Sequence, residues 1–257
     1  MKRIALAVNV LIYLFILSPI LITIPASFND SVLVAAVPQH LSLRWYRNFL
    51  ATPELVGAMG LSFRLATVST VFALVLGTLA ALALVRFRFP GRNTARALVM
   101  SPMVIPGLIL GLALLIFFTR VGLAGSFTSL VLAHVVVALP YSIRMLTAGL
   151  QGMDSALVEA AMSLGARPTV AFRTVTLPLL KSAMLASAIF AFVTSLDELV
   201  VTLFLTGPRL STLPVEMYNY IEVTSDPTIA AISVLLIVFT SALVLALEKL
   251  IGFGAVT

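Results

Sequence analysis

Residues 154–178 read DSALVEAAMSLGARPTVAFRTVTLP and separate two long apolar runs, residues 121–143 and 182–206. The second run contains Asp197 and Glu198 as its only charged residues. A helix needs roughly 20 residues to cross a hydrocarbon core about 30 Å thick, and both runs are long enough. Because backbone polar groups cannot remain unpaired in lipid, both runs are predicted to be helices. The quoted stretch is therefore expected to connect two membrane-spanning helices.

The connecting stretch carries its own helix signals. Asp154 or Ser155 can cap the start of a short helix and Gly165 can close its end, because these residues suit the free backbone groups there. Pro168 is suited to the first position of a second helix, which we expect Leu177-Pro178 to end before the next span. The stretch therefore predicts two short helices joined by a bend.

The composition of the 257 residues argues against a water-soluble domain. Hydrophobic residues make up 61% of the chain and charged residues 10%, and the mean hydropathy is +1.15, so a fold in water would expose large apolar patches. The net charge of +6 does not indicate nucleic-acid binding, since the cations are dispersed between apolar runs. The absence of cysteine excludes disulfides, thiolate metal sites and cysteine nucleophiles.

Apolar runs of sufficient length recur along the whole chain. We therefore predict an all-α, polytopic membrane protein that forms a single transmembrane domain over residues 1–257. A loop of about residues 149–180 is the only long internal loop. The six predicted spans cover about residues 4–26, 60–85, 97–118, 124–145, 182–205 and 228–248.

The loop charges orient these spans. Eleven of the sixteen Lys and Arg residues fall on the side of the N-terminus, which places both termini in the cytoplasm. On the outer side, residues 27–57 contain Trp45, Tyr46 and Phe49, which predict a short helix whose aromatic residues anchor it in the headgroup region. The inner cations are Lys2, Arg3, Arg86, Arg88, Arg92, Arg96, Arg144, Arg167, Arg173, Lys181 and Lys249.

The long internal loop resembles the EAA loop of bacterial ABC importer permeases. That pattern is E-A-A, three residues, G, nine residues and I-x-L-P, and this chain departs from it only by Val175 in place of Ile. The resemblance implies the type I (MetI-like) permease fold and a coupling helix that sits in a cleft of a separate ATPase. It further implies two ATPase copies, which bind the ATP and Mg²⁺, a second homologous permease and a periplasmic solute-binding protein. The residues it assigns to ATPase coupling are Glu159, Ala160, Ala161, Gly165, Leu177 and Pro178.

Weaker signatures narrow the resemblance to spermidine/putrescine permeases of the PotC type in the bacterial inner membrane. Permeases for iron, thiamine and phosphonates share several of these signatures, so these solutes are alternatives. The similar stretches are Ser27-Phe28-Asn29-Asp30-Ser31, Leu43-Arg44-Trp45-Tyr46, Ile105-Pro106-Gly107, Thr194-Ser195-Leu196-Asp197-Glu198 and Thr206-Gly207-Pro208.

The two carboxylates of the fifth span favour a cationic solute. Asp197 and Glu198 lie about sixteen residues beyond Lys181, near the membrane midplane, where a charge costs roughly 2.5–3.5 kcal/mol unless it faces water or a partner. We expect one of them, preferably Asp197, to face the pathway. The alternative is a structural pair that holds the fifth helix to the partner permease. Aromatic candidates for contact with a polyamine are Phe190, Phe192 and Tyr218.

Two further features lie within the spans. His134 is predicted to form hydrogen bonds between helices rather than to relay protons, since no second His or carboxylate is near it in the sequence. The third span is predicted to be kinked by Pro102, Pro106, Gly107 and Gly111.

We predict no enzymatic activity, no bound cofactor and no metal. The sequence contains no G-x-x-x-x-G-K-[ST] loop for ATP, and two isolated histidines without cysteines argue against a zinc site. A self-sufficient secondary transporter or channel is the functional alternative. Such folds usually contain internal repeats, and the two halves of this sequence show no similarity.

Overall fold

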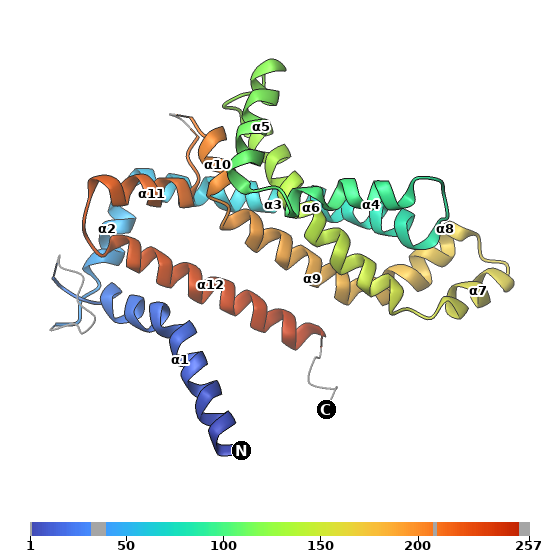
Figure 1. The fold of residues 1–257 in the computed structure, drawn as a ribbon, viewed down its shortest axis with the longest axis horizontal. Helices are drawn as coiled ribbons and strands as arrows, with labels where there is room; N and C mark the ends of the chain where they lie inside the picture. Colours follow the sequence, from blue (N-terminus) through green and yellow to red (C-terminus); the bar gives the residue numbers. More distant parts are fainter. Residues whose placement is uncertain (1, 32–39, 208–209, 252–257) are drawn as a thin grey trace. The chain divides into compact units, whose positions relative to one another are not determined.

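The computed structural model describes residues 2–31, 40–207 and 210–251, and these are almost entirely helical (Figure 1). The all-α prediction is confirmed. A 3₁₀ turn, η1 (Ser101–Met103), and a π-helical turn, η2 (Phe172–Thr176), interrupt the series of α-helices. The α-helices are α1 (Lys2–Ser27), α2 (Arg44–Ala51), α3 (Pro53–Arg86), α4 (Arg92–Met100), α5 (Gly107–Arg120), α6 (Phe127–Gln151), α7 (Ser155–Ser163), α8 (Pro168–Ala171), α9 (Leu177–Leu196), α10 (Val200–Leu205), α11 (Leu213–Val223) and α12 (Thr228–Ile251).

Among the described residues, five helices are long and apolar enough to cross a membrane. They are α1, α3, α6, the helix formed by α8, η2 and α9, and α12. The bent pair made by α4 with η1 and by α5 supplies a sixth span if the pair crosses as one.

The third predicted span, residues 97–118, is broken rather than continuous. Its two parts, Arg92–Met103 and Gly107–Arg120, are bent by 103° relative to each other. Pro102 lies in η1 and Pro106 directly precedes α5, and a proline lacks the backbone donor and crowds the preceding turn. The predicted kink is therefore present, and it is large enough to end one helix and start another.

The fifth predicted span, residues 182–205, differs from expectation at both ends. Leu177-Pro178 does not end a helix, because α8 continues through η2 into α9. A π turn shifts the hydrogen bonds to more distant carbonyls, which lets the helix accommodate the missing N–H of Pro178. At its other end α9 stops at Leu196, and α10 begins only at Val200.

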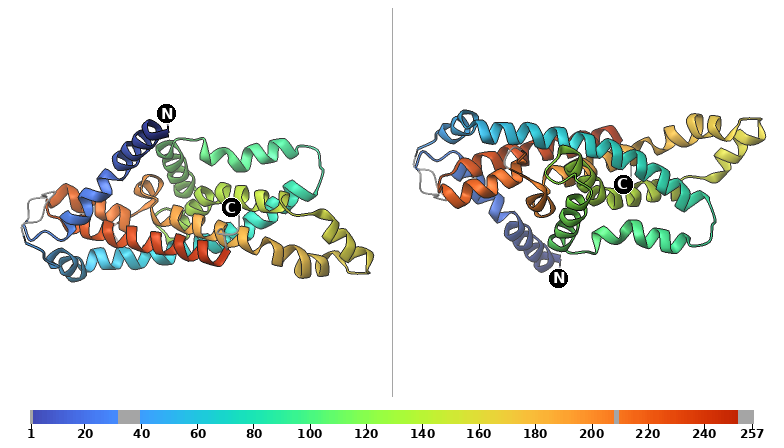
Figure 2. Two further views of the ribbon diagram at one scale, coloured as in Figure 1. Left: turned by 90° about the horizontal axis from the view of Figure 1, so that it is seen from below. Right: turned by 90° about the horizontal axis from the view of Figure 1, so that it is seen from above.

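The chain divides into two compact units, Met1–Ala58 with Glu216–Ala242 and Met59–Val215 with Leu243–Thr257. In the larger unit α6 packs along α9, and α10 packs on α5. Beyond the ends of α6 and α9, α7 and α8 project as a knob (Figures 1 and 2). One core cluster of this unit consists of Leu65, Phe118, Leu130, Val131, Ala133, Val135, Val201 and Leu205.

In the smaller unit, two of the three aromatic residues of α2, Trp45 and Phe49, are buried and are not free to anchor in a headgroup region. Trp45 and Phe49 are each 3% exposed, and the indole Nε1–H of Trp45 donates to the Asn29 carbonyl at 2.6 Å. Tyr46 forms a hydroxyl–hydroxyl hydrogen bond with Ser27 at 2.9 Å. The short helix is therefore as predicted, but its aromatic face packs against the protein because residues four apart share one helix face.

A polar network joins α2, α11 and α12 within the same unit. The Asn48 amide donates to the hydroxyl of Thr228 at 2.8 Å and to that of Tyr220 at 3.2 Å. Tyr220 in turn donates to the Asp226 carboxylate at 2.9 Å. Burial, followed by the hydrogen bond and the negative charge of Asp226, raises the pKa of Tyr220 above its ordinary value of 10.0.

Candidate functional site

The knob formed by α7 and α8 is built from strong local signals. The Asp154 carboxylate accepts a hydrogen bond from the Ala156 backbone N–H at 2.9 Å, which caps α7 as predicted. At the other end Gly165 has a φ of +92°, a left-handed conformation that favours glycine. The N–H groups of Gly165 and Ala166 donate to the carbonyls of Met162 and Ala161, which is the Schellman arrangement that closes a helix.

The surface of the knob is unusually apolar for an exposed helix. None of the residues of α7 is buried. Leu164 is 90% exposed, and Leu157 and Met162 are each about half exposed. Of the candidate coupling residues, Glu159, Ala160, Gly165 and Pro178 are exposed, whereas Ala161 and Leu177 are half-buried. An exposed apolar patch with a charged residue at its edge is typical of an interaction surface.

The knob is attached to a tightly packed helix pair. A methyl group on Gly149 of α6 would lie 2.4 Å from the Cβ of Ala183 on α9, so the two helices approach more closely than any larger residue permits. Ala81, Leu146, Leu150 and Leu180 form a buried cluster in the same region. The knob is therefore joined to two helices that cannot slide past each other without disturbing this contact.

The break between α9 and α10 places the two candidate carboxylates in different roles. The Glu198 side chain accepts a hydrogen bond from the Val201 backbone N–H at 2.9 Å and so caps the start of α10. Asp197 is exposed, and within the described residues its carboxylate has no hydrogen-bond partner. Phe190, which is 47% exposed, lies seven residues earlier and therefore on the same face of α9 as Asp197.

The other two aromatic candidates lie elsewhere in the fold, one on another side of α9 and one in the smaller unit. Phe192 lies on a different side of α9 and contacts Phe63, with the ring centroids 6.0 Å apart. Tyr218 belongs to α11 in the other unit and is 43% exposed. Hydrogen bonding to Glu222 is the main cause that raises the pKa of Tyr218 above its ordinary value.

A buried hydrogen-bond network holds the α9–α10 break against α6. His134 Nδ1 lies 2.7 Å from the Ser195 hydroxyl, and Nε2 lies 2.9 Å from the Thr202 hydroxyl. The Thr202 hydroxyl donates its proton to the Glu198 carbonyl, so in the neutral imidazole Nε2–H donates to Thr202 and Nδ1 accepts from Ser195. His134 thus joins α6, α9 and α10, so the predicted hydrogen bonds between helices are present. The sequence does not identify Ser195 and Thr202 as the partners of His134, because serine and threonine are common in membrane helices, where many of them bond only to the backbone of their own helix.

The described residues contain no group of three or more His, Cys, Asp or Glu that could hold a metal ion. The arrangement consists instead of an exposed knob, a rigid helix pair and a helix break with one carboxylate held and one exposed.

The chain is similar to known transport permeases. The chain is 35% identical over 232 residues to the putrescine transport system permease PotI of Escherichia coli K12, which covers 88% of this chain and 82% of that protein. It is 32% identical over 235 residues to the spermidine/putrescine permease PotC of the same strain, with 91% and 89% coverage. The molybdenum transport permease ModB of Mycobacterium bovis is 34% identical over 223 residues, with 81% and 82% coverage.

Solved structures share the fold. A bacterial ABC transporter that imports the acidic polysaccharide alginate superimposes with a TM-score of 0.76 at 14% identity, covering 97% of this chain and 94% of that one. The MetNI methionine ABC transporter gives a TM-score of 0.66 at 23% identity, with 77% and 94% coverage. Residues 73–253 match the family described as the binding-protein-dependent transport system inner membrane component. The chain belongs to this family of membrane permeases.

Proposed function

We propose that this chain is the permease subunit of an ATP-driven importer for a polyamine, either putrescine or spermidine. The observation that carries the proposal is the similarity to PotI and PotC, which extends over about nine-tenths of the chain. ModB is similar to a comparable degree, so the solute is argued further from the residues. Iron, thiamine and phosphonate are the competing solutes.

The exposed face of the α9–α10 break suits a polyamine. Asp197 offers an uncommitted carboxylate to an ammonium group, while Phe190 offers an aromatic ring to the methylene chain and to cation–π contact. An oxyanion would be repelled by the same carboxylate. Glu198 serves the protein itself, since it caps α10.

The test is uptake into proteoliposomes that contain the importer assembled with its partner subunits. We expect uptake of labelled putrescine or spermidine, and we expect an excess of unlabelled thiamine, phosphonate or chelated iron to reduce this uptake only weakly. Asp197→Asn should weaken polyamine-dependent transport about 10- to 100-fold, the range for loss of a charge-assisted hydrogen bond. Glu198→Gln is the matched control, because the amide oxygen can still accept from Val201 and should leave uptake within a few-fold. Uptake of an anion instead, or equal effects of the two substitutions, would contradict the assignment.

The energy for transport is proposed to enter through the knob. Each of two ATPase subunits binds ATP and Mg²⁺, and α7 sits in a cleft of one of them, so that ATPase closure moves α6 and α9. The residues proposed to act here are Glu159, Ala160, Ala161, Gly165, Leu177 and Pro178, of which Leu177 and Pro178 are the first two residues of α9. The exposed apolar surface of α7 supports this role.

The remaining partners follow from this arrangement. A second permease, homologous to this chain, completes the pathway, and a periplasmic binding protein delivers the solute to the outer side. Both termini and the knob lie in the cytoplasm, and the chain has no enzymatic activity of its own. Solute movement by this chain purified alone would favour a secondary transporter or channel instead.

A further inference from the structure

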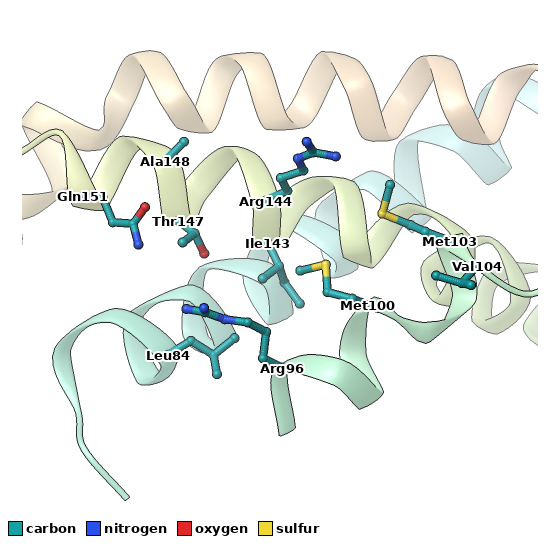
Figure 3. A pocket seen from close by; sticks show the side chains of 10 residues that line it. All are labelled: Leu84, Arg96, Met100, Met103, Val104, Ile143, Arg144, Thr147, Ala148 and Gln151. Carbon is teal, nitrogen blue, oxygen red and sulfur yellow. The ribbon is translucent and has the colours of Figure 1, made fainter. Parts of the chain in front are cut away.

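A cavity of about 650 Å³ lies between α3, α4 with η1, and α6 in the larger unit (Figure 3). Its volume falls within the range of small-molecule sites, roughly 300–1,000 Å³. It is separate from the knob and from the α9–α10 break, and none of the residues proposed for coupling or for the solute lines it. Its lining consists of Leu84, Arg96, Met100, Met103, Val104, Ile143, Arg144, Thr147, Ala148 and Gln151.

The charge of this cavity is positive. Arg96 and Arg144 are both exposed, and the described residues that line the cavity include no Asp or Glu. In Figure 3, Arg96 extends from α4 toward α6, whereas Arg144 extends from α6 away from Arg96. Two guanidinium groups without a carboxylate repel a polyamine and attract an anion. The cavity therefore does not serve the cationic solute.

The lining changes from polar to apolar along the cavity. On α6, Gln151, Thr147 and Ile143 are four residues apart and share one face, with the amide toward the knob and the apolar residue farther from it. On α4 the same direction leads from Arg96 to Met100, one helical turn later. An amphipathic ligand, with an anionic group beside Arg96 and a hydrocarbon chain beside the methionines, fits this gradient.

We propose that the cavity binds an anionic phospholipid of the inner leaflet, with its phosphate at Arg96. The polar end of the cavity lies at the end of α6 that leads into the knob, which is the cytoplasmic end in the proposed orientation. Arg96 donates to the phosphate in the planar, two-pronged geometry of a guanidinium, with Thr147 and Gln151 as neighbouring donors. The thioethers of Met100 and Met103 adapt to an acyl chain, since methionine fills irregular apolar space. Basic pockets between membrane helices on the cytoplasmic side commonly hold such headgroups.

The experiment measures lipid retained by the importer after purification from bilayers of phosphatidylglycerol and phosphatidylethanolamine, by native mass spectrometry. We expect selective retention of phosphatidylglycerol, and about tenfold weaker retention in Arg96→Gln, in line with the loss of one charge-assisted hydrogen bond. Arg96→Lys keeps the charge and should retain most of the selectivity. Arg88→Gln is the matched control, because it removes the same charge from the neighbouring turn without touching the cavity.

Three outcomes would overturn the proposal. Equal retention of phosphatidylethanolamine would remove the selectivity for an anion. An equal loss in Arg88→Gln would show diffuse attraction by the basic loop rather than a site. If glycerol phosphate displaces the bound lipid as effectively as phosphatidylglycerol does, and Met100→Gln has no effect, the cavity binds a free anion of the cytoplasm instead. Retention is measured without solute or ATP, so failure here and failure of polyamine transport are distinguished.

Discussion

The contact between Gly149 and Ala183 makes the sharpest prediction about packing. In Gly149→Ala the new methyl group would lie 2.4 Å from the Cβ of Ala183 and 3.1 Å from Cδ1 of Leu180. The Leu180 methyl can turn aside, but a Cβ cannot. Carbon atoms in contact are about 3.5–4.0 Å apart, so α6 and α9 must separate locally by roughly 1–1.5 Å.

The cost of this separation can be bounded. Overpacking of a close-packed contact costs typically about 1–3 kcal/mol. Alanine also favours a helix interior over glycine by about 0.5–1 kcal/mol, which offsets part of the loss. Gly152→Ala is the matched control, because its nearest neighbour would be at 3.5 Å, an ordinary contact, and its φ of −77° suits alanine.

The assay is the thermal midpoint of the importer assembled with its partner subunits, measured in detergent. Each kcal/mol corresponds to about 2–4 °C for a chain of this size, so Gly149→Ala should unfold several degrees below Gly152→Ala. Ala183→Gly removes the opposing methyl, and the double variant should be more stable than the sum of the single changes by about 1–3 kcal/mol. Equal midpoints for the two glycine variants, or a double variant that is merely additive, would refute the close approach of α6 and α9.

Three further predictions concern the knob, the hydrogen bonds of His134 and the polar network of the smaller unit. Gly165→Pro and Glu159→Lys should leave membrane insertion intact but lower copurification of the ATPase and solute-stimulated ATP hydrolysis, whereas normal values of both would remove the knob from coupling. His134→Ala should lower the free energy of unfolding by about 1–3 kcal/mol through two lost hydrogen bonds, and an unchanged thermal midpoint would show that Ser195 and Thr202 find other partners. The raised pKa of Tyr220 stabilises the fold below pH 10, and this contribution is lost as the pH rises through the folded-state pKa. Tyr220→Phe should therefore make the thermal midpoint fall less steeply above pH 10. A fall as steep as in the parent chain would contradict this prediction.

Features set by local backbone chemistry could be predicted from the sequence. The cap at Asp154 and the left-handed turn at Gly165 depend on neighbouring residues within one turn of helix, and both occur as expected. Hydropathy likewise predicts the positions of the spans, because each apolar run must pair its own backbone polar groups in lipid. The helical knob between two long helices can therefore be predicted from the sequence without any tertiary contact.

Features set by tertiary contacts could not be predicted in this way. Trp45 is typical of a membrane interface by residue type, but in the structure it is buried and bonded to Asn29. Glu198 and Asp197 are adjacent in the sequence, and only the break after Leu196 shows that one caps a helix while the other is exposed. The continuation of the helix through Pro178 also requires the π turn, for which hydropathy carries no signal.

The break between α4 and α5 has a consequence for the life of the chain in the cell. Residues 104–106 lie outside any regular helix, and Val104 is 84% exposed. The N–H groups of Val104 and Ile105 donate to the Ser101 carbonyl and the Pro106 carbonyl accepts from Leu110, so among the described residues only the carbonyls of Val104 and Ile105 have no backbone partner here. Hydrocarbon offers these two carbonyls no hydrogen bonds, so we expect them to face a neighbouring subunit or trapped water. We expect a copy synthesised in excess of its assembly partners to expose these two carbonyls to lipid and to become a substrate for membrane proteases. Stoichiometric synthesis of the subunits is then a condition for this permease to accumulate.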